Sequence, residues 1–214
     1  MHGQYYHKDR KESDHREVET LIREAFWNLN VPGCNEHYLA HVLRSHKDFI
    51  PELDLVAELD GRIAGNVMYS KSHLTDESGN VKEILTFGPL SVLPQYQRKG
   101  IGKALLEHSF EEAVKMGYDA VVIFGSPANY IPRGFKSCKR YNICLEGGFF
   151  PTAMLVKELK EGVLDGRKMT FSESEAFNID SEKAEEFDRL FPQKEKCVCA
   201  SQEEFFIYSH SSVN

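Results

Sequence analysis

"LPQYQRKGIGKALLEHSF", residues 93–110, is the stretch that decides the fold. Gly100 and Gly102 open a helical pattern directly after Arg98 and Lys99, and Lys103 adds a third positive charge. A helix N-terminus offers unpaired backbone N–H groups and a partial positive charge. Glycines let an anion approach that backbone without a side chain in the way. The stretch therefore predicts a binding site for a phosphate-like anion.

Two common phosphate-binding loops do not fit this stretch. A P-loop has Ser or Thr after its Gly-Lys pair, whereas Ala104 follows Gly102 and Lys103 here. The dinucleotide fingerprint G-x-G-x-x-G needs a third glycine where Leu105 stands. The pattern that remains is Q-x-x-G-x-G at residues 97–102.

The elements on either side of this pattern predict a strand–helix–strand unit. Residues 82–94, KEILTFGPLSVLP, read as a strand that Gly88-Pro89 interrupts, which indicates a bulge or bend. A helix over residues 100–116 should be ended by the glycine that follows it. Residues 119–127, DAVVIFGSP, are almost continuously apolar, as in a parallel strand buried on both faces. We therefore predict a right-handed βαβ unit over residues 84–124.

The rest of the sequence supplies further elements and an extension. Before the unit we expect a strand at 5–10 and a helix at 13–30 with Ser13 as N-cap. A break at Pro32-Gly33 should follow, then a second helix with an apolar face at Tyr38, Leu39, Val42 and Leu43, and a hairpin at 53–74 turning at Asp60-Gly61. After it we expect strands at 139–146 and 152–159, then short helices at 181–191 and 201–208, the latter with a Ser201–Glu204 capping box. We interpret residues 1–161 as one domain and residues 162–214, which are more charged and less periodic, as an extension packed on it.

Composition narrows the class of protein. The 214 residues are 41% hydrophobic and 28% charged, with a formal net charge of −7, as in a soluble globular chain that is a poor general binder of nucleic acid. No segment is apolar for the roughly 20 residues of a membrane span, and the N-terminus lacks the apolar region of a secretory signal. We therefore expect a cytoplasmic protein, monomeric or homodimeric, with neither membrane nor nucleic acid as partner. The five cysteines are interpreted as free thiols, mostly buried.

In this context the sequence resembles the GCN5-related N-acetyltransferase (GNAT) superfamily. That superfamily has the acetyl-CoA motif Q/R-x-x-G-x-G/A, which residues 97–102 match. The resemblance extends from Phe87 to Phe135, including Tyr130 and Gly134-Phe135, and the order of elements fits over roughly residues 5–160. It is closest to uncharacterised bacterial acetyltransferases of the small-molecule type. It implies the GNAT acyl-CoA N-acyltransferase fold, an α/β fold with a mostly antiparallel mixed sheet, a splayed parallel pair and helices on both faces.

The resemblance also implies how acetyl-CoA is held. The backbone of the motif should bind the CoA pyrophosphate, through residues Gln97, Arg98, Lys99, Gly100, Ile101, Gly102 and Lys103. The strand edge at Leu90, Ser91 and Val92 should pair with the pantetheine amides, like an added half-strand. The bend at Gly88-Pro89 frees that edge, and Asn129 should meet the end of the pantetheine arm.

The chemistry implied is direct transfer of the acetyl group to a free amine. A backbone N–H near Leu90 would polarise the thioester carbonyl, and Tyr130 would protonate the leaving thiolate. Several members of the superfamily carry a glutamate base on the bent strand, where this chain has Thr86. Glu83, three residues earlier, is our candidate base. A base relayed by water, a histidine from elsewhere, or no base at all for an amine that arrives neutral are the alternatives.

The acceptor should bind between the first two expected helices, where members of the superfamily commonly build this pocket. Phe26 and Trp27 would supply aromatic walls, and Glu36 with His37 a polar end that suits a cation. His37 and His41 share a helix face, but no third metal ligand is evident, so we expect no metal. Cys34 as a covalent acetyl carrier is a further alternative, although GNAT enzymes transfer directly.

Each of these features also has a plainer interpretation. The glycine motif is also compatible with an ordinary helix cap, Tyr130 with a packing tyrosine, Asn129 with a cap, and Glu83 with a solvated strand end. Phe26 and Trp27 are also typical of a core. For the whole protein, we predict an N-acetyltransferase acting on a primary amine of a small molecule or peptide. A CoA-binding regulatory module without turnover, and an acetyltransferase for protein N-termini or lysines, are the alternatives.

Overall fold

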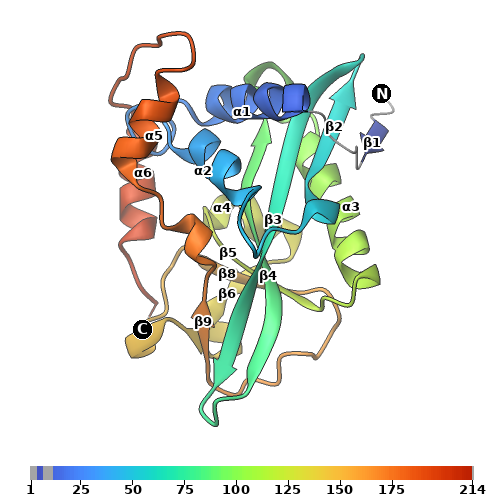
Figure 1. Cartoon of the computed structure of the whole chain (residues 1–214). Helices are drawn as coiled ribbons and strands as arrows, with labels where there is room; N and C mark the ends of the chain where they lie inside the picture. The colour runs from blue at the N-terminus through green and yellow to red at the C-terminus, as the bar shows by residue number, and fades with distance from the viewer. Residues whose placement is uncertain (1–3, 7–11, 214) are drawn as a thin grey trace.

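A computed structural model describes residues 4–6 and 12–213 of the chain as one mixed sheet flanked by helices. Among these residues the sheet has nine strands in the order β1-β2-β3-β4-β5-β8-β6, while β9 pairs with both β3 and β7. Most neighbours are antiparallel; β4 with β5 and β7 with β9 are parallel. Figure 1 shows the long β3–β4 pair running through the centre of the molecule. The mixed sheet and its parallel pair confirm the predicted fold class.

The bounds of the elements are as follows. The strands are β1 (Gln4–Tyr6), β2 (Leu55–Leu59), β3 (Arg62–Asp76), β4 (Val81–Val92), β5 (Ala120–Phe124), β6 (Lys136–Ser137), β7 (Ile143–Cys144), β8 (Met154–Glu158) and β9 (Met169–Ser172). The helices are α1 (Glu12–Phe26), α2 (Glu36–Leu43), α3 (Ile101–Lys115), α4 (Pro127–Tyr130), α5 (Ser181–Asp188) and α6 (Ala200–Ser209).

Helices cover both faces of the sheet because successive residues of a strand point to opposite sides. In β3, Val67 and Tyr69 pack in a cluster with Leu105 and Leu106 of α3. Met68, between them, packs on the other face with residues of α1 and α2. A third cluster is built around residues of β5, β7, β8 and β9. The two helical layers predicted by the resemblance are therefore present.

The predicted hairpin and βαβ unit are both confirmed. β2 and β3 are antiparallel and turn at Asp60 and Gly61, whose φ values of 53° and 75° are those of a two-residue hairpin turn. α3 follows β4, and Gly100 caps its N-terminus with a φ of 89°. β5 then lies parallel to β4, with β8 antiparallel on its other edge.

Local expectations differ from the structure at several element ends. α1 already includes Ser13, which is therefore not its N-cap, and it ends at Phe26 instead of continuing to residue 30. The predicted strand at 5–10 is present as β1, and its residues 7–10 lie outside the described part of the chain. The predicted strand at 139–146 is a 3-10 turn and the two-residue β7, separated by Asn142 with a left-handed φ of 56°. The positive φ breaks the extended backbone that a longer strand needs.

The extension after residue 162 contributes a strand to the central sheet. β9 pairs antiparallel with β3 from His73↔Ser172 to Asp76↔Met169. The two predicted helices are present as α5 and α6, but the N-cap of α6 is Cys199, and the Ser201 hydroxyl donates to the carbonyl of Leu29 instead of capping. Figure 1 shows α5 beside α2. The division into two units at residue 162 stays a prediction.

A buried ion pair fixes α5 to α1. The Arg23 guanidinium, 2% exposed, donates from Nε to Asp188 Oδ1 at 2.6 Å and from Nη2 to Asp188 Oδ2 at 3.2 Å. A guanidinium and a carboxylate that share two hydrogen bonds hold each other in one geometry. The ring of Phe191 stacks under the guanidinium of Arg16 at 3.4 Å, so a second residue of α1 contacts the same segment.

We expect Asp188→Ala to destabilise the protein by about 3 kcal/mol, because it leaves the buried Arg23 guanidinium without its anion. Urea unfolding at pH 7 measures this loss. Glu185→Ala is the matched control, since Glu185 on the same helix pairs with Lys196 at 3.3 Å in an exposed position and should cost less than about 1 kcal/mol. Equal losses in the two variants would contradict the structural role of the Arg23–Asp188 pair.

Candidate active site

The two central parallel strands part and leave a cleft between them. Their pairing is recorded at Leu85↔Val121 alone. Beyond this point a pocket of about 530 Å³ opens, with β4 from Phe87 to Val92 on one side and residues 124–130 on the other. We call this pocket the main cleft. Its remaining lining comes from Ala25, Phe26, Leu29, Asn30, Asn35, Glu36, Leu39, Gln97, Glu173, Phe177, Ile179, Phe205 and Tyr208.

A bulge at Gly88-Pro89 turns β4 where the cleft begins. Val67 pairs with Leu90 and Tyr69 pairs with Phe87, so Gly88 and Pro89 together oppose Met68 alone. A bulge of this kind bends its strand and increases the local twist. The bend that the sequence predicted at Gly88-Pro89 is thereby confirmed.

Beyond the bulge, β4 presents a backbone edge to the cleft. Leu90, Ser91 and Val92 pair on one side with Val67, Asn66 and Gly65 of β3. Among the described residues no strand pairs with the opposite edge of this segment, which lines the cleft. An unpaired strand edge carries free N–H and C=O groups that can pair with another extended chain.

The predicted anion site lies at the N-terminus of α3. Gly100 is the N-cap, with no side chain that caps the helix, so the first backbone N–H groups of the helix keep no intrahelical partner. Of the seven motif residues, Gln97 lines the main cleft, and its side chain donates to the carbonyl of Val92 at 3.1 Å. Lys99 instead donates to the carbonyl of Gln95 at 2.9 Å. Ile101 packs against the core cluster of α3.

A second set of cations lies beside this helix. Lys103, Arg133 and Lys157 line a pocket of about 310 Å³ together with Leu106, Glu107, Phe110 and Pro132. Lys157 donates to the carbonyl of Arg133 at 3.0 Å, and burial lowers the pKa of its ammonium. The motif predicted Lys103, whereas Arg133 and Lys157 come from distant segments and carried no local signal.

Tyr130 lines the main cleft from the end of α4. Its ring packs against Phe87 and Phe135, with centroids 5.7 and 5.6 Å away. Gly125 leaves room for the ring, because a Cβ at that position would lie 2.5 Å from Tyr130 Cε2. Burial, together with the nearby Tyr208, raises the pKa of Tyr130 to about 12 against the opposing effect of Arg133. The phenol therefore remains protonated at neutral pH and is available as an acid.

Two of the four predicted acceptor residues line the main cleft. Phe26 and Glu36 belong to it, with the Glu36 carboxylate accepting from Asn30 Nδ2 at 2.9 Å and from the backbone N–H of Asn35 at 3.0 Å. Burial raises the pKa of Glu36. Trp27 is not part of the cleft, because its indole turns to the extension and donates to the carbonyl of Glu195 at 2.9 Å. The structure does not bring His37 there either, since its side chain is fully buried under α5.

His37 instead lies between Cys34 and Asp188. Its Nδ1 is 3.4 Å from Cys34 Sγ, and its Nε2 is 3.2 Å from Asp188 Oδ1. A Cys–His–Asp row of this kind can activate a cysteine as a nucleophile. Here, however, burial raises the pKa of the Cys34 thiol to about 12. Burial also lowers the pKa of His37. A thiol that stays protonated next to a neutral imidazole is not an activated nucleophile, so this row of groups is structural.

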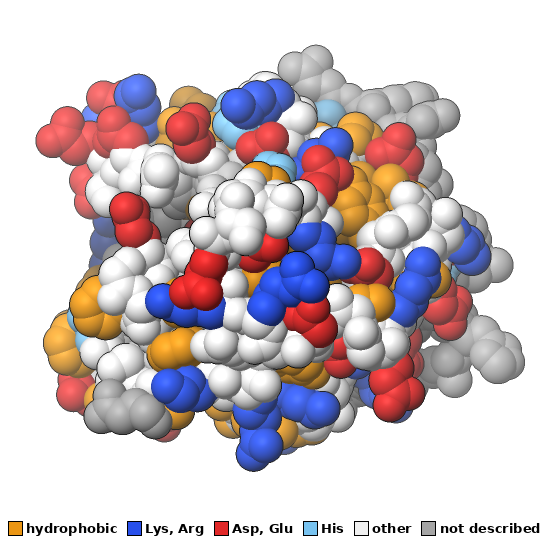
Figure 2. All heavy atoms as spheres, turned by 90° about the horizontal axis from the view of Figure 1, so that it is seen from below, with side chains coloured by type: hydrophobic (Ala, Val, Ile, Leu, Met, Phe, Trp, Pro, Cys, Tyr) orange, Lys and Arg blue, Asp and Glu red, His pale blue; other side chains and the backbone are white. Residues whose placement is uncertain are grey.

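The candidate base Glu83 is remote from the main cleft. It lies seven residues before Leu90 on β4, about 23 Å along an extended strand at 3.3 Å per residue. Its carboxylate accepts from Lys71 Nζ at 3.3 Å and from the Tyr118 hydroxyl at 3.2 Å. The face that Figure 2 views from below, where the β3–β4 turn lies, carries acidic and basic side chains interspersed. Because Glu83 is not part of the cleft lining, the structure does not bring it together with Tyr130.

The extension supplies cleft residues that we did not predict. Glu173, Phe177 and Ile179 follow β9, and Phe205 and Tyr208 come from α6. Burial raises the pKa of Glu173 to about 7. The only sequence signal was a carboxylate in an otherwise weakly periodic tail, which does not distinguish a buried glutamate from a solvated one. Asn129, which was predicted, lines the cleft from α4.

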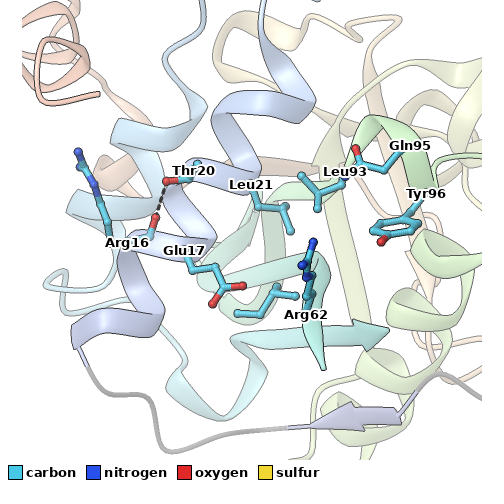
Figure 3. A pocket seen from close by; sticks show the side chains of 9 residues that line it. Arg16, Glu17, Thr20, Leu21, Arg62, Leu93, Gln95 and Tyr96 are labelled. Atoms are coloured by element: carbon cyan, nitrogen blue, oxygen red, sulfur yellow. Dashed lines mark hydrogen bonds between the residues drawn. The ribbon is translucent and has the colours of Figure 1, made fainter. Parts of the chain in front are cut away.

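A separate cavity of about 360 Å³ lies between α1 and the turn after β4 (Figure 3). Figure 3 shows Arg62 upright between Glu17 of α1 and Tyr96, with Leu21 and Leu93 above it in this view. This cavity shares no lining residue with the main cleft. Because this cavity lies apart from Tyr130 and from the β4 edge, the main cleft is the candidate active site.

No three His, Cys, Asp or Glu side chains within residues 4–6 and 12–213 are grouped closely enough to hold a metal ion. No helix in the same residues combines the length and the apolar character needed to span a membrane.

Known proteins share this architecture. The sequence profile described as "Acetyltransferase (GNAT) family" matches residues 21–135. The chain is 31% identical over 127 residues to "Uncharacterized N-acetyltransferase YjhQ" of Escherichia coli K12, which covers 59% of this chain and 65% of YjhQ. The chain thus spans slightly less than two thirds of the length of that relative.

Solved structures are similar over more of the chain. The E. coli GNAT family N-acetyltransferase YhbS in complex with CoA matches with a TM-score of 0.69 and 25% identity, over 83% of this chain and 92% of YhbS. A GNAT family acetyltransferase from Brucella melitensis in complex with acetyl-CoA matches in fold, with a TM-score of 0.63 and 22% identity over 82% of this chain and 98% of the other. Because the family profile covers more than half of the sequence, the chain belongs to the GCN5-related N-acetyltransferase (GNAT) family.

Proposed function

We propose that this protein transfers the acetyl group of acetyl-CoA to a primary amine of a small molecule or peptide. The observation that carries the proposal is the free edge of β4 at Leu90–Val92, which lines the main cleft together with Gln97 of the motif and Tyr130. Acetyl-CoA supplies the activated thioester. Membership of the GNAT family and the similarity to YhbS, a structure with CoA, support this choice of cofactor.

The residues present fit the successive parts of the cofactor. Backbone N–H groups at Gly100 to Lys103 suit a pyrophosphate at a helix N-terminus. The cations Lys103, Arg133 and Lys157, beside that helix, suit a further phosphate. The open edge of β4 suits the amides of the pantetheine arm, which can pair as an extended strand does.

Tyr130 suits the role of the acid that protonates the departing thiolate. Its raised pKa keeps the proton on the phenol at neutral pH, so the hydroxyl can donate a hydrogen bond to the departing sulfur and pass its proton to the thiolate as the C–S bond breaks. The Tyr130 ring packs against Phe87, and Gly125 has no side chain that would push the ring out of this place. A backbone N–H at the bulge, near Leu90, suits the developing negative charge on the carbonyl oxygen.

We expect Gly102→Asp to weaken CoA binding about 30-fold, a loss of about 2 kcal/mol, because a carboxylate would take the N–H groups that a phosphate needs. Aspartate in the first turn of a helix stabilises the helix, so the fold should be retained. Gly102→Ala is the matched control, because its methyl group would meet Val92 at an ordinary 3.5 Å. Titration calorimetry with CoA gives both affinities, and unchanged binding by the Asp variant would mean that the motif is only a helix cap.

We expect Tyr130→Phe to lower kcat about 100-fold while the affinity for acetyl-CoA is unchanged, because only the proton donor is lost. Gly125→Ala should lower kcat as well, since its new Cβ would lie 2.5 Å from the Tyr130 ring and displace it. Steady-state rates against a panel of primary amines measure both effects. Wild-type binding of CoA without acetylation of any amine would favour a regulatory CoA-binding module instead.

A further inference from the structure

Glu173 is held at the main cleft by the strand before it and the turn after it. Ser172, its neighbour, ends β9 and pairs with His73 of β3. On the other side, the hydroxyl of Ser174 donates to Asp48 Oδ2 at 2.7 Å and accepts from the backbone N–H of Ala176. The backbone is therefore fixed on both sides of Glu173, which keeps this residue in the lining of the cleft.

The segment that carries Glu173 covers the bulge of β4. The ring of Phe177, four residues later, comes so close to Gly88 that a Cβ there would lie 3.2 Å from Phe177 Cε1. Glu173 and Phe177 line the cleft together with Gly88, Pro89 and Tyr130. The extension thus adds one carboxylate to the cleft that the free β4 edge and the proposed acid also line.

No group among the described residues neutralises this carboxylate. Among the described residues, no ion pair or hydrogen bond to the Glu173 side chain is recorded, and burial is the one influence on its pKa, which it raises to about 7. The titratable groups that share the cleft are Glu36 of α2, Tyr130 of α4 and Tyr208 of α6, and no Lys, Arg or His lines it within the described chain. His46 and Asp48 contact the hydroxyl of Ser174, the next residue along the chain, and do not line the cleft. A partly buried carboxylate without a cation suits a cationic ligand or a transferable proton.

We propose that Glu173 is the general base of this enzyme and takes a proton from the ammonium form of the acceptor amine. This rests on the proposed function. The C-terminal extension would then supply the base that the bent strand lacks. On that strand, the Thr86 hydroxyl contacts Ser72 at 2.7 Å and cannot act as a base, and Glu83 lies outside the cleft.

The proton balance is complete with the amine and acetyl-CoA alone. The ammonium gives one proton to Glu173, and the neutral amine attacks the thioester carbon. The C–N bond forms and the C–S bond breaks, and the thiolate takes the Tyr130 proton. The phenolate recovers a proton from the acylated nitrogen. Glu173 then releases its proton to solvent, so that amide, free CoA thiol and one proton leave the site.

The charge of the cleft also defines the class of acceptor. Two carboxylates, Glu36 and Glu173, stand among the aromatic side chains of Phe26, Phe177 and Phe205 without a compensating cation in the lining. Such a site attracts an amine with an apolar body and repels one with a carboxylate next to the nitrogen. The acceptor is therefore a cationic amine in preference to a free amino acid.

Rates with acetyl-CoA and a panel of cationic amines (2-phenylethylamine, tryptamine and spermidine), measured from pH 5.5 to 9.5, test the assignment. We expect kcat of the wild type to rise through about pH 7, because a base must be ionised to accept a proton. Glu173→Gln should lower kcat about 100-fold and abolish this limb, while the affinity for acetyl-CoA stays the same. Glu175→Gln, an exposed change two residues away, is the matched control and should behave as the wild type.

The outcomes are distinguishable. Turnover by Glu173→Gln at the wild-type rate, with the limb near pH 7 retained, would overturn the role of Glu173 and leave the proposed function intact. A rise of kcat at the pKa of the amine itself would also overturn the role of Glu173, because it would mean that the amine arrives neutral. No turnover of any amine by the wild type would overturn both proposals. For Glu173→Ala, recovery of rate with added formate would support the base even if that variant is less stable.

Discussion

The separation of β4 from β5 is the constraint on which the rest of the site depends. Parallel strands that stay paired leave no free edge, whereas here pairing is recorded at Leu85↔Val121 and the bulge at Gly88-Pro89 then turns β4 away. The same turn frees the backbone of Leu90 to Val92 on one side while β3 holds it on the other. A ligand arm can therefore be bound by main-chain groups that are already fixed by the sheet.

In our proposal, recognition by main-chain groups explains why few of the motif side chains contact the cleft. Gly100 and Gly102 contribute by the absence of side chains at a helix N-terminus, and Lys99 is occupied with the carbonyl of Gln95. Positive charge comes instead from Lys103, Arg133 and Lys157, which three separate elements bring to one pocket. The net charge of −7 is thus compatible with a local site for a polyanion.

The main cleft, where we propose that the acceptor binds, has the opposite character. Its lining within the described chain has carboxylates but no basic side chain, and it includes aromatic residues from the N-terminal helices and from the extension. Burial raises the pKa of Glu36 and Glu173, which lowers the cost of keeping both acids close to a cofactor that is itself anionic. In our proposal, one of these acids replaces the base that the bent strand lacks at Thr86.

The sequence by itself determined the features that depend on neighbouring residues. The Asp60-Gly61 turn, the bend at Gly88-Pro89, the βαβ unit and the glycines that open α3 were predicted from local chemistry and are present. Element ends were less accurate, as at Ser13 and at residues 139–146, because a cap or a short strand depends on contacts from other segments.

Only the tertiary structure decided which side chains share the cleft. Trp27 and His37 fit an acceptor site by sequence, but α5 and its neighbouring segment cover them. Glu173 is separated from Tyr130 by more than 40 residues and reaches the same cleft because β9 pairs with β3. The proximity of these two residues has no local sequence pattern. It depends on the pairing of distant strands and on burial, and the residues around Glu173 predict neither.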